Sequence, residues 1–217
     1  MDVTYRRPPA ALADEFFLIA HDDRSGRARL HPRAVGLGLA AALLGELLLV
    51  GRVQLRFGLV GVVAAAPVAD PLAAAVLDQL RDQRSALDAH TWLAYLARGA
   101  TDAVGQRLVR GGRVSRAQPR LGRWRPVRYV PTSLNDAAWP ATRLRMLLSR
   151  GDAVPTADVL LAGLVRACGL LGHVLWDNPP GALAYLDQLT SHLPPPAREL
   201  IAQTEAAVGN AVLAARA

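Results

Sequence analysis

Residues 34–50 read AVGLGLAAALLGELLLV, and this stretch decides the fold. Its large apolar residues recur at the spacing of one helix face, at Val35, Leu39, Leu43, Leu47 and Val50. Pro32 suits the first helical turn and Gly51 suits the end of a helix. The run is shorter than the roughly 20 residues that span a bilayer, and it contains Glu46. We therefore predict a buried helix, so that any membrane contact of this protein is peripheral.

Glu46 is the one charged side chain inside this run. A carboxylate among leucines must reach the surface or meet a cation, because an unpaired buried charge is costly. Arg33 and Arg52 flank the run, so we expect a structural ion pair with a partner such as one of these.

The rest of the chain indicates further helices separated by glycine and proline. Asp70-Pro71 combines a side-chain cap with a proline at the first helical position. Residues 52–57 alternate polar and apolar before Gly58 and Gly61, as in a short hairpin. Helices are predicted over residues 12–23, 32–50, 70–87, 88–98, 101–110, 141–150, 156–176, 181–192 and 196–215.

These elements predict a mainly α fold, a single-domain helical bundle with one or two short β-hairpins, one of them basic and protruding. A chain of 217 residues, 52% hydrophobic, is long enough to bury such a core. Residues 1–10 are expected to be a flexible lead, and residues 11–217 the domain. The opening lacks the uninterrupted apolar run of a secretory signal, and the single cysteine cannot form an internal disulfide. We expect a cytoplasmic protein.

Residues 107–128 hold eight arginines and no acidic side chain. The whole net charge of +7 arises there, because the remaining chain has seventeen arginines against eighteen carboxylates. Several glycines and prolines in the segment indicate a loop or hairpin rather than a continuous helix. The expected membrane-contact residues of this hairpin are Arg116, Arg120, Leu121, Arg123, Trp124, Arg125, Arg128 and Tyr129.

A concentrated basic segment with aromatic residues is typical of a surface that binds a polyanion. One ligand is an anionic membrane, into whose headgroup layer a basic and aromatic tip would fit. The alternative is a nucleic acid, with the hairpin as a wing and Trp124 stacking on bases. The latter is disfavoured because no helix rich in Arg, Asn and Gln accompanies the hairpin. A solvated loop without function is the third interpretation.

Residue patterns that would carry chemistry are absent from the sequence. The five histidines are scattered, and there is no HExxH, paired CxxC, GxSxG or phosphate-binding glycine motif. Cys168 lies in an apolar run, which is typical of a buried thiol. We expect a non-enzymatic protein with no catalytic residues, no metal site and no cofactor. An enzyme acting on a charged lipid headgroup is the least favoured alternative.

Several segments, taken in order, resemble the Golgi phosphoprotein 3 family, specifically its actinobacterial-type members. Residues 12–20 read LADEFFLIA, and a turn at residues 23–26, DRSG, leads to the long helix. That helix ends in ELLLVGRVQL at residues 46–55, close to the family's ELxLxGRLxL run. Residues 107–114, RLVRGGRV, resemble its LVxxGVL element, so that the resemblance spans nearly the whole chain.

This resemblance implies a mostly helical domain that binds phosphatidylinositol 4-phosphate in a basic pocket. It also implies that the hairpin contacts the membrane and self-associates, and that the protein is an adaptor that binds the cytoplasmic tails of membrane proteins. When the chain is aligned to the family without gaps from Gly26, His31 falls at the position of the family's pocket tryptophan. Arg98 falls at the first of two paired pocket arginines and Thr101 at the second. Ala40 falls at the remaining pocket arginine, which lies in the long helix. The expected partner is an anionic phospholipid or phosphoinositide on the inner face of the membrane, and the expected lipid-binding residues are His31, Arg98, Arg107 and Arg110.

Overall fold

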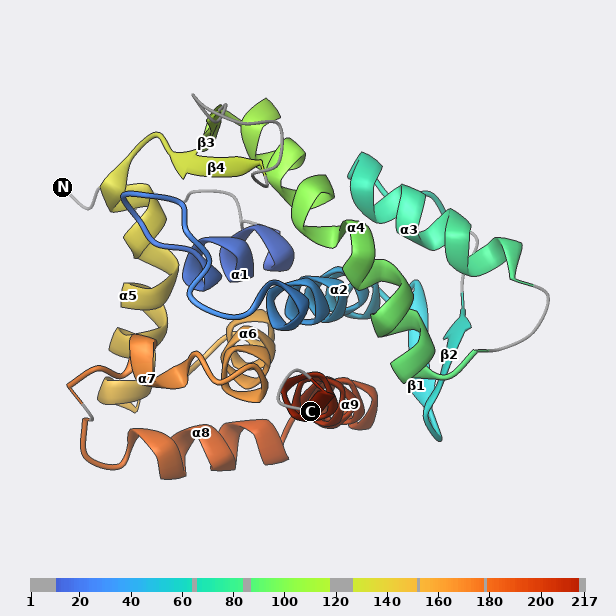
Figure 1. The fold of residues 1–217 in the computed structure, drawn as a ribbon. Coiled ribbons are helices and arrows are strands. Elements are labelled where there is room, and N and C mark those ends of the chain that lie inside the picture. The colour runs from blue at the N-terminus through green and yellow to red at the C-terminus, as the bar shows by residue number, and fades with distance from the viewer. Residues whose placement is uncertain are drawn as a thin grey trace, which may run out of the picture.

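A computed structural model of the protein describes residues 11–63, 66–83, 87–117, 127–151, 153–177 and 179–214. Over these ranges the fold is mainly α, with nine helices and two short antiparallel sheets of two strands each (Figure 1). The predicted flexible lead, residues 1–10, lies outside the described residues. The helices are α1 (Leu12–Ala20), α2 (Pro32–Leu49), α3 (Pro71–Asp82), α4 (Ala89–Arg110), α5 (Leu134–Arg150), α6 (Thr156–Ala167), α7 (Leu171–Val174), α8 (Ala182–Ser191) and α9 (Pro195–Ala214).

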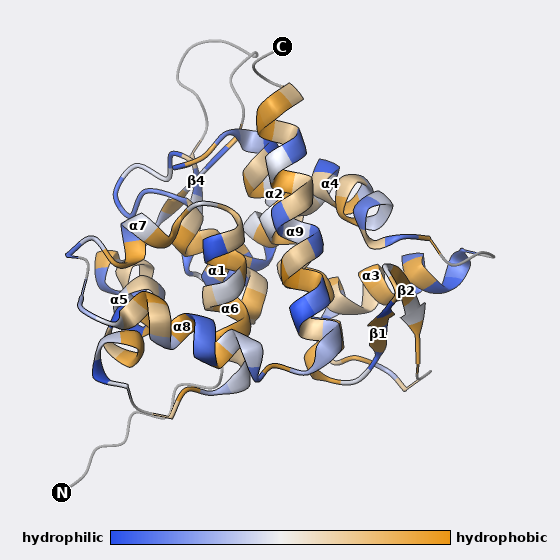
Figure 2. Cartoon of the chain, turned by 90° about the horizontal axis from the view of Figure 1, so that it is seen from below, coloured by the Kyte–Doolittle hydropathy of each residue, from blue (hydrophilic) through white to orange (hydrophobic). Residues whose placement is uncertain are grey.

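The central element is α2, whose apolar run had predicted a buried helix. It packs against α1, α4, α6 and α9, and Figure 2 shows it alongside α9. The helix is long and apolar enough to cross a membrane by composition, but most of it is buried inside the protein. Pro32 begins it, and the backbone N–H of Arg33 donates to the side chain of His31. Gly36 permits close contact with α4, because a Cβ at this position would lie 2.6 Å from the carbonyl oxygen of Ala97.

The long helix α4 differs from the prediction of two helices broken at Gly99. It runs without interruption through Gly99 and Thr101. A glycine in a helix interior costs only about 1 kcal/mol. The buried side chains on either side of it, including Leu96 and Val104, pack against the rest of the core and hold the helix together. Its start was correctly predicted, since Asp88 accepts a hydrogen bond from the backbone N–H of Thr91 at 2.8 Å.

Other helix boundaries also differ from the prediction: α1 ends at Ala20 rather than residue 23, and α3 ends at Asp82 rather than residue 87. Ser133 caps α5, so this helix begins well before residue 141 and contains Pro140, which removes one backbone hydrogen bond without ending it. The predicted helix 156–176 is divided, because α6 ends at Ala167 and Gly169 takes a left-handed conformation, φ +79°. Helix α5 therefore continues through Pro140, whereas the left-handed backbone at Gly169 ends the predicted helix early.

The two hairpins lie on opposite sides of the helices (Figure 1). The first joins β1 (Val53–Arg56) to β2 (Leu59–Val62), where the sequence predicted it. The second pairs β3 (Val114–Ala117) with β4 (Arg128–Pro131), so that Arg116 faces Tyr129 in the ladder. Strands therefore form within the basic segment, whose predicted tip residues Arg120, Leu121, Arg123, Trp124 and Arg125 lie outside the described residues.

Candidate functional site

A cavity of about 420 Å³ lies where α2, α4, β4 and the segment after α1 meet. We call it the Tyr129 cavity. Arg27 and Arg128 line it, and no carboxylate is among its described lining residues, which are His21, Gly26, Arg27, Ala28, Pro32, Val35, Thr101, Val127, Arg128 and Tyr129. The start of α2 forms part of the wall, and the positive end of a helix dipole favours an anion.

The turn that places Arg27 at this cavity is held by Asp22. Its Oδ1 accepts hydrogen bonds from the backbone N–H and the hydroxyl of Ser25, at 2.8 and 2.7 Å. These bonds lower the pKa of Asp22 to about 2, so the carboxylate is ionised and engaged within the turn. Gly26 has φ +63°, and a Cβ there would overlap the backbone of Tyr129. Only glycine allows this turn to approach β4 closely enough to complete the cavity.

His21 is the buried polar residue of the same cavity. Its Nδ1 lies 2.7 Å from the carbonyl oxygen of Phe17, and its ring stacks on that phenyl ring with centroids 4.0 Å apart. Burial lowers the pKa of His21, and the nearby Arg29 lowers it further. Arg29 donates from Nε to the carbonyl of His21 at 3.1 Å and pairs with Asp23 at 3.0 Å. The imidazole is therefore fixed in orientation, and its burial disfavours the protonated form.

Tyr129 lies inside the protein, which contradicts the prediction that it contacts a membrane. Its side chain is buried, and its hydroxyl donates to Asp102 Oδ1 at 3.1 Å. The ring lies against Gly105, where a Cβ would come within 2.5 Å of it, and meets Phe17 edge to face. This residue thus anchors β4 to α4 and positions its neighbour Arg128 at the cavity.

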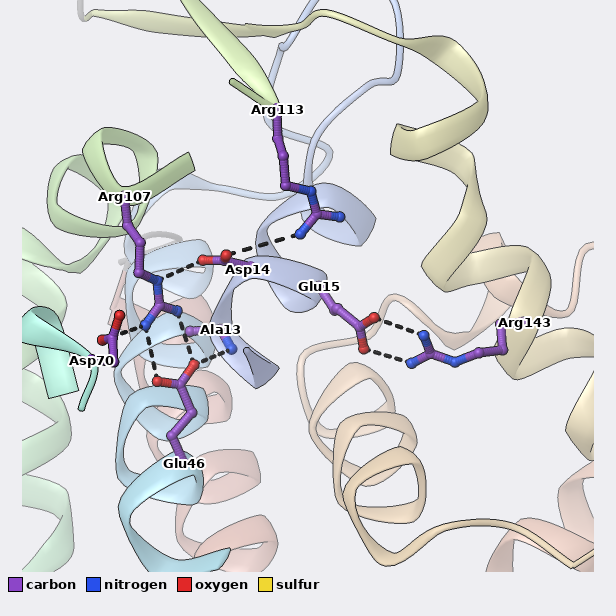
Figure 3. Close-up of polar contacts among 8 residues, drawn as sticks. All are labelled: Ala13, Asp14, Glu15, Glu46, Asp70, Arg107, Arg113 and Arg143. Atoms are coloured by element: carbon purple, nitrogen blue, oxygen red, sulfur yellow. Dashed lines mark hydrogen bonds and ion pairs between the residues drawn. The ribbon is translucent and has the colours of Figure 1, made fainter. Parts of the chain in front are cut away.

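Arg107 is buried as well, and it does not face a ligand. Its side chain is 9% exposed and reaches between carboxylates of three other segments (Figure 3). Nε donates to Asp14 at 2.7 Å, the two terminal nitrogens donate to both oxygens of Glu46 at 3.0 and 2.9 Å, and one of them also donates to Asp70 at 3.0 Å. We call these four residues the Arg107 cluster. The prediction that Arg107 binds lipid is wrong, because its donors are committed to these carboxylates.

The Arg107 cluster also answers the question raised by Glu46. The predicted structural ion pair exists, but its partner is Arg107 rather than Arg33 or Arg52. Glu46 Oε1 additionally accepts from the backbone N–H of Ala13 at 2.8 Å. Burial acts to lower the pKa of Arg107, but Glu46 and Asp14 outweigh it and hold that pKa above its ordinary value.

A second buried ion cluster, which the sequence did not reveal, lies beside the first. Arg143 of α5 donates to both oxygens of Glu15, at 2.7 and 2.5 Å, and to Asp158 of α6 at 2.5 Å. Glu15 follows Asp14 in α1, so neighbouring residues of one helix serve the two clusters (Figure 3). The signal available in the sequence was the pair of acids within the apolar segment LADEFF.

The other predicted lipid-binding residues are not gathered at one place. His31 is exposed and directly precedes Pro32 of the Tyr129 cavity. Arg98 lines a different cavity of about 310 Å³, between α3 and α4. Arg110 is exposed in the last turn of α4, and Arg116 is exposed on β3. Among the described members of the predicted set, only Arg128 is an arginine of the Tyr129 cavity, while Arg27 and His21 were missed.

Metal and thiol chemistry find no support in the part of the chain that the structure describes. No group of three or more His, Cys, Asp or Glu side chains is placed there to hold a metal ion. Cys168 is buried, and burial raises the pKa of its thiol to about 12, far above that of a reactive cysteine.

Comparison with known proteins identifies one family. Residues 12–212 match the sequence model of the family described as Golgi phosphoprotein 3 (GPP34). The match begins with the first residue of α1 and ends within α9, so it covers nearly all of the described helices. No protein with a curated description matches the chain.

Proposed function

Since the chain belongs to the Golgi phosphoprotein 3 family, we propose that it is a peripheral membrane protein that binds the headgroup of an anionic phospholipid in the Tyr129 cavity. The protein acts without catalysis, from the cytoplasmic side of the membrane. As an adaptor it holds the cytoplasmic tails of membrane proteins, and the basic hairpin takes part in self-association.

The observation that carries this proposal is the composition of the cavity. Two arginines, Arg27 and Arg128, line it, and no carboxylate is among the described lining residues. Arginine binds phosphate through two parallel hydrogen bonds, so this pair suits a phosphate group. Ala28, Pro32 and Val35 supply apolar wall, which suits the glycerol backbone of a lipid. The volume of about 420 Å³ lies within the range of small-molecule sites.

The position of the cavity supports a membrane as the source of the ligand. Arg128 belongs to β4, and its ladder partner strand β3 carries the exposed Arg116. The hairpin of the basic segment therefore starts at the cavity, and its arginines add a general attraction to an anionic surface. Each arginine near such a surface contributes about 1 kcal/mol, so a few of them suffice for reversible attachment.

Flotation with vesicles tests this function. Wild-type protein should float with vesicles of phosphatidylcholine and phosphatidylglycerol, and not with phosphatidylcholine alone. The double variant Arg27→Ala/Arg128→Ala should bind roughly 30-fold more weakly, because two arginines at about 1 kcal/mol each are lost. Arg150→Ala/Arg198→Ala is the charge-matched control, since both arginines are exposed on α5 and α9 and lie outside the cavity lining.

Equal recovery on neutral and anionic vesicles would show the proposal to be wrong. So would equal binding by the two double variants, because the effect would then be one of net charge. A mobility-shift assay with duplex DNA separates the competing ligand. If the cavity variant loses DNA binding while its vesicle recovery is unchanged, the polyanion is a nucleic acid.

A further inference from the structure

His21 differs from every other described residue that lines the Tyr129 cavity. Histidine is the side chain whose ordinary pKa lies close to physiological pH. The arginines of the cavity stay charged, and the hydroxyl of Tyr129 is bound to Asp102. Only His21 can therefore change the charge of this lining within the physiological range.

The hydrogen bond to Phe17 determines which nitrogen is left for a ligand. A carbonyl oxygen can only accept, so Nδ1 of His21 carries the proton that it shares with Phe17. Among the described residues, Nε2 has no hydrogen-bond partner. Neutral His21, a lining residue of the cavity, thus keeps a lone pair on Nε2, which does not attract phosphate. A proton on Nε2 turns it into a donor without breaking the bond to Phe17 or moving the ring.

Burial is the main reason why the pKa of His21 is lowered. The hydrogen bond to Phe17 opposes this effect, and Arg29, which holds the backbone carbonyl of His21, adds to it. Arg27 and Arg128 line the same cavity.

The acidic groups nearby do not cancel this effect. Asp22 is engaged by Ser25, and Asp23 is paired with Arg29. Asp102 of α4 is bound to Tyr129. His173 of α7 lies near Arg29, Asp22 and Asp23. A phosphate bound beside Arg27 and Arg128 would bring the negative charge that favours an imidazolium.

We propose that headgroup binding takes up a proton: a phosphodiester enters the Tyr129 cavity with one proton, which binds Nε2 of His21, so that binding tightens as the pH falls. This inference rests on the proposed function, because it concerns the same ligand and cavity. It makes His21 a specificity-determining residue that distinguishes a phosphate from an uncharged group.

Vesicles containing phosphatidylglycerol are the suitable probe, because its phosphodiester keeps the same charge between about pH 5.5 and pH 8, where histidine titrates. Wild-type affinity should rise as the pH falls, by at most about tenfold per unit, since one proton is taken up. His21→Phe keeps the stack on Phe17 but cannot titrate, so its affinity should not change with pH and should match wild type at the alkaline end. Calorimetry in buffers of different ionisation enthalpy should show proton uptake for wild type and none for this variant.

The exposed His31 beside the cavity provides the matched control. His31→Gln should keep the pH dependence of wild type. His21→Gln is the second test variant, because it remains polar if a phenyl ring proves incompatible with folding; circular dichroism at both pH extremes verifies the fold. It too should bind without pH dependence.

The outcomes separate this inference from the proposed function. Wild-type binding that is strong but independent of pH overturns the role of His21 and leaves the lipid site standing. A pH dependence that survives in both His21 variants, or disappears in His31→Gln, overturns it equally. Failure of the wild type to bind anionic vesicles at any pH overturns both.

Discussion

Substitution of Arg107 by methionine tests the central ion cluster of this protein. Methionine keeps much of the length of the side chain but removes every donor and the charge. Glu46 would remain buried without its cation, Asp14 would keep only the more distant Arg113 at 3.9 Å, and the half-buried Asp70 would lose Arg107 as well. Breaking a buried ion pair by removing one partner costs about 3–5 kcal/mol. We expect Arg107→Met to lower the free energy of unfolding by this amount.

Chemical denaturation followed by circular dichroism provides the measurement. Arg110→Met is the matched control, because Arg110 is exposed in the last turn of the same helix. It should lose less than about 1 kcal/mol, the interaction of a cation with the helix end.

Adding Glu46→Gln to Arg107→Met should recover at least about 1 kcal/mol, since residues in one ion network are strongly coupled. The reasoning is refuted if Arg107→Met is as stable as Arg110→Met. It is also refuted if removing the carboxylate of Glu46 from the arginine-free protein destabilises it further.

Three further predictions concern packing, strain and reactivity. Gly36→Ala should lower stability by about 1–3 kcal/mol in thermal unfolding, because its methyl group would collide with the carbonyl of Ala97; unchanged stability would mean that the two helices separate easily. Phe57 has φ +52° and is 94% exposed, so Phe57→Gly should raise stability by about 1 kcal/mol, and a loss would show that its ring makes an unrecognised contact. Cys168 should resist a thiol reagent at mildly alkaline pH until denaturant is added, and rapid labelling of the folded protein would contradict its burial.

Local signals predicted the secondary structure best. The cap and proline at Asp70-Pro71 and the cap at Asp88 mark true helix starts, because the residues that make these hydrogen bonds are three positions apart. The apolar run around α2 also predicted that this helix is buried. Gly99 gave a false break, since whether a helix survives a glycine depends on packing against distant segments.

The role of each arginine could not be predicted in this way. Composition treats residues 107–128 as one basic surface, whereas Arg107 is buried and its carboxylates lie 37 to 93 residues away in the sequence. Arg27 was missed for the opposite reason. It lies near Asp22 and Asp23, which look like compensating charges but are engaged by Ser25 and Arg29. The sequence shows which charged side chains exist, but only the fold shows which of them are not engaged in ion pairs and can bind a ligand.

The placement of Glu46 has a consequence for the nascent chain. During synthesis α2 leaves the ribosome as an apolar segment of 18 residues, of the kind that the translocon tests for insertion. Its future partner Arg107 is made 61 residues later, so Glu46 is uncompensated over that interval. An ionised carboxylate in such a segment opposes its transfer into lipid by a few kcal/mol. We expect the carboxylate that joins α1, α2 and α4 in the folded protein to keep the newly made helix out of the lipid.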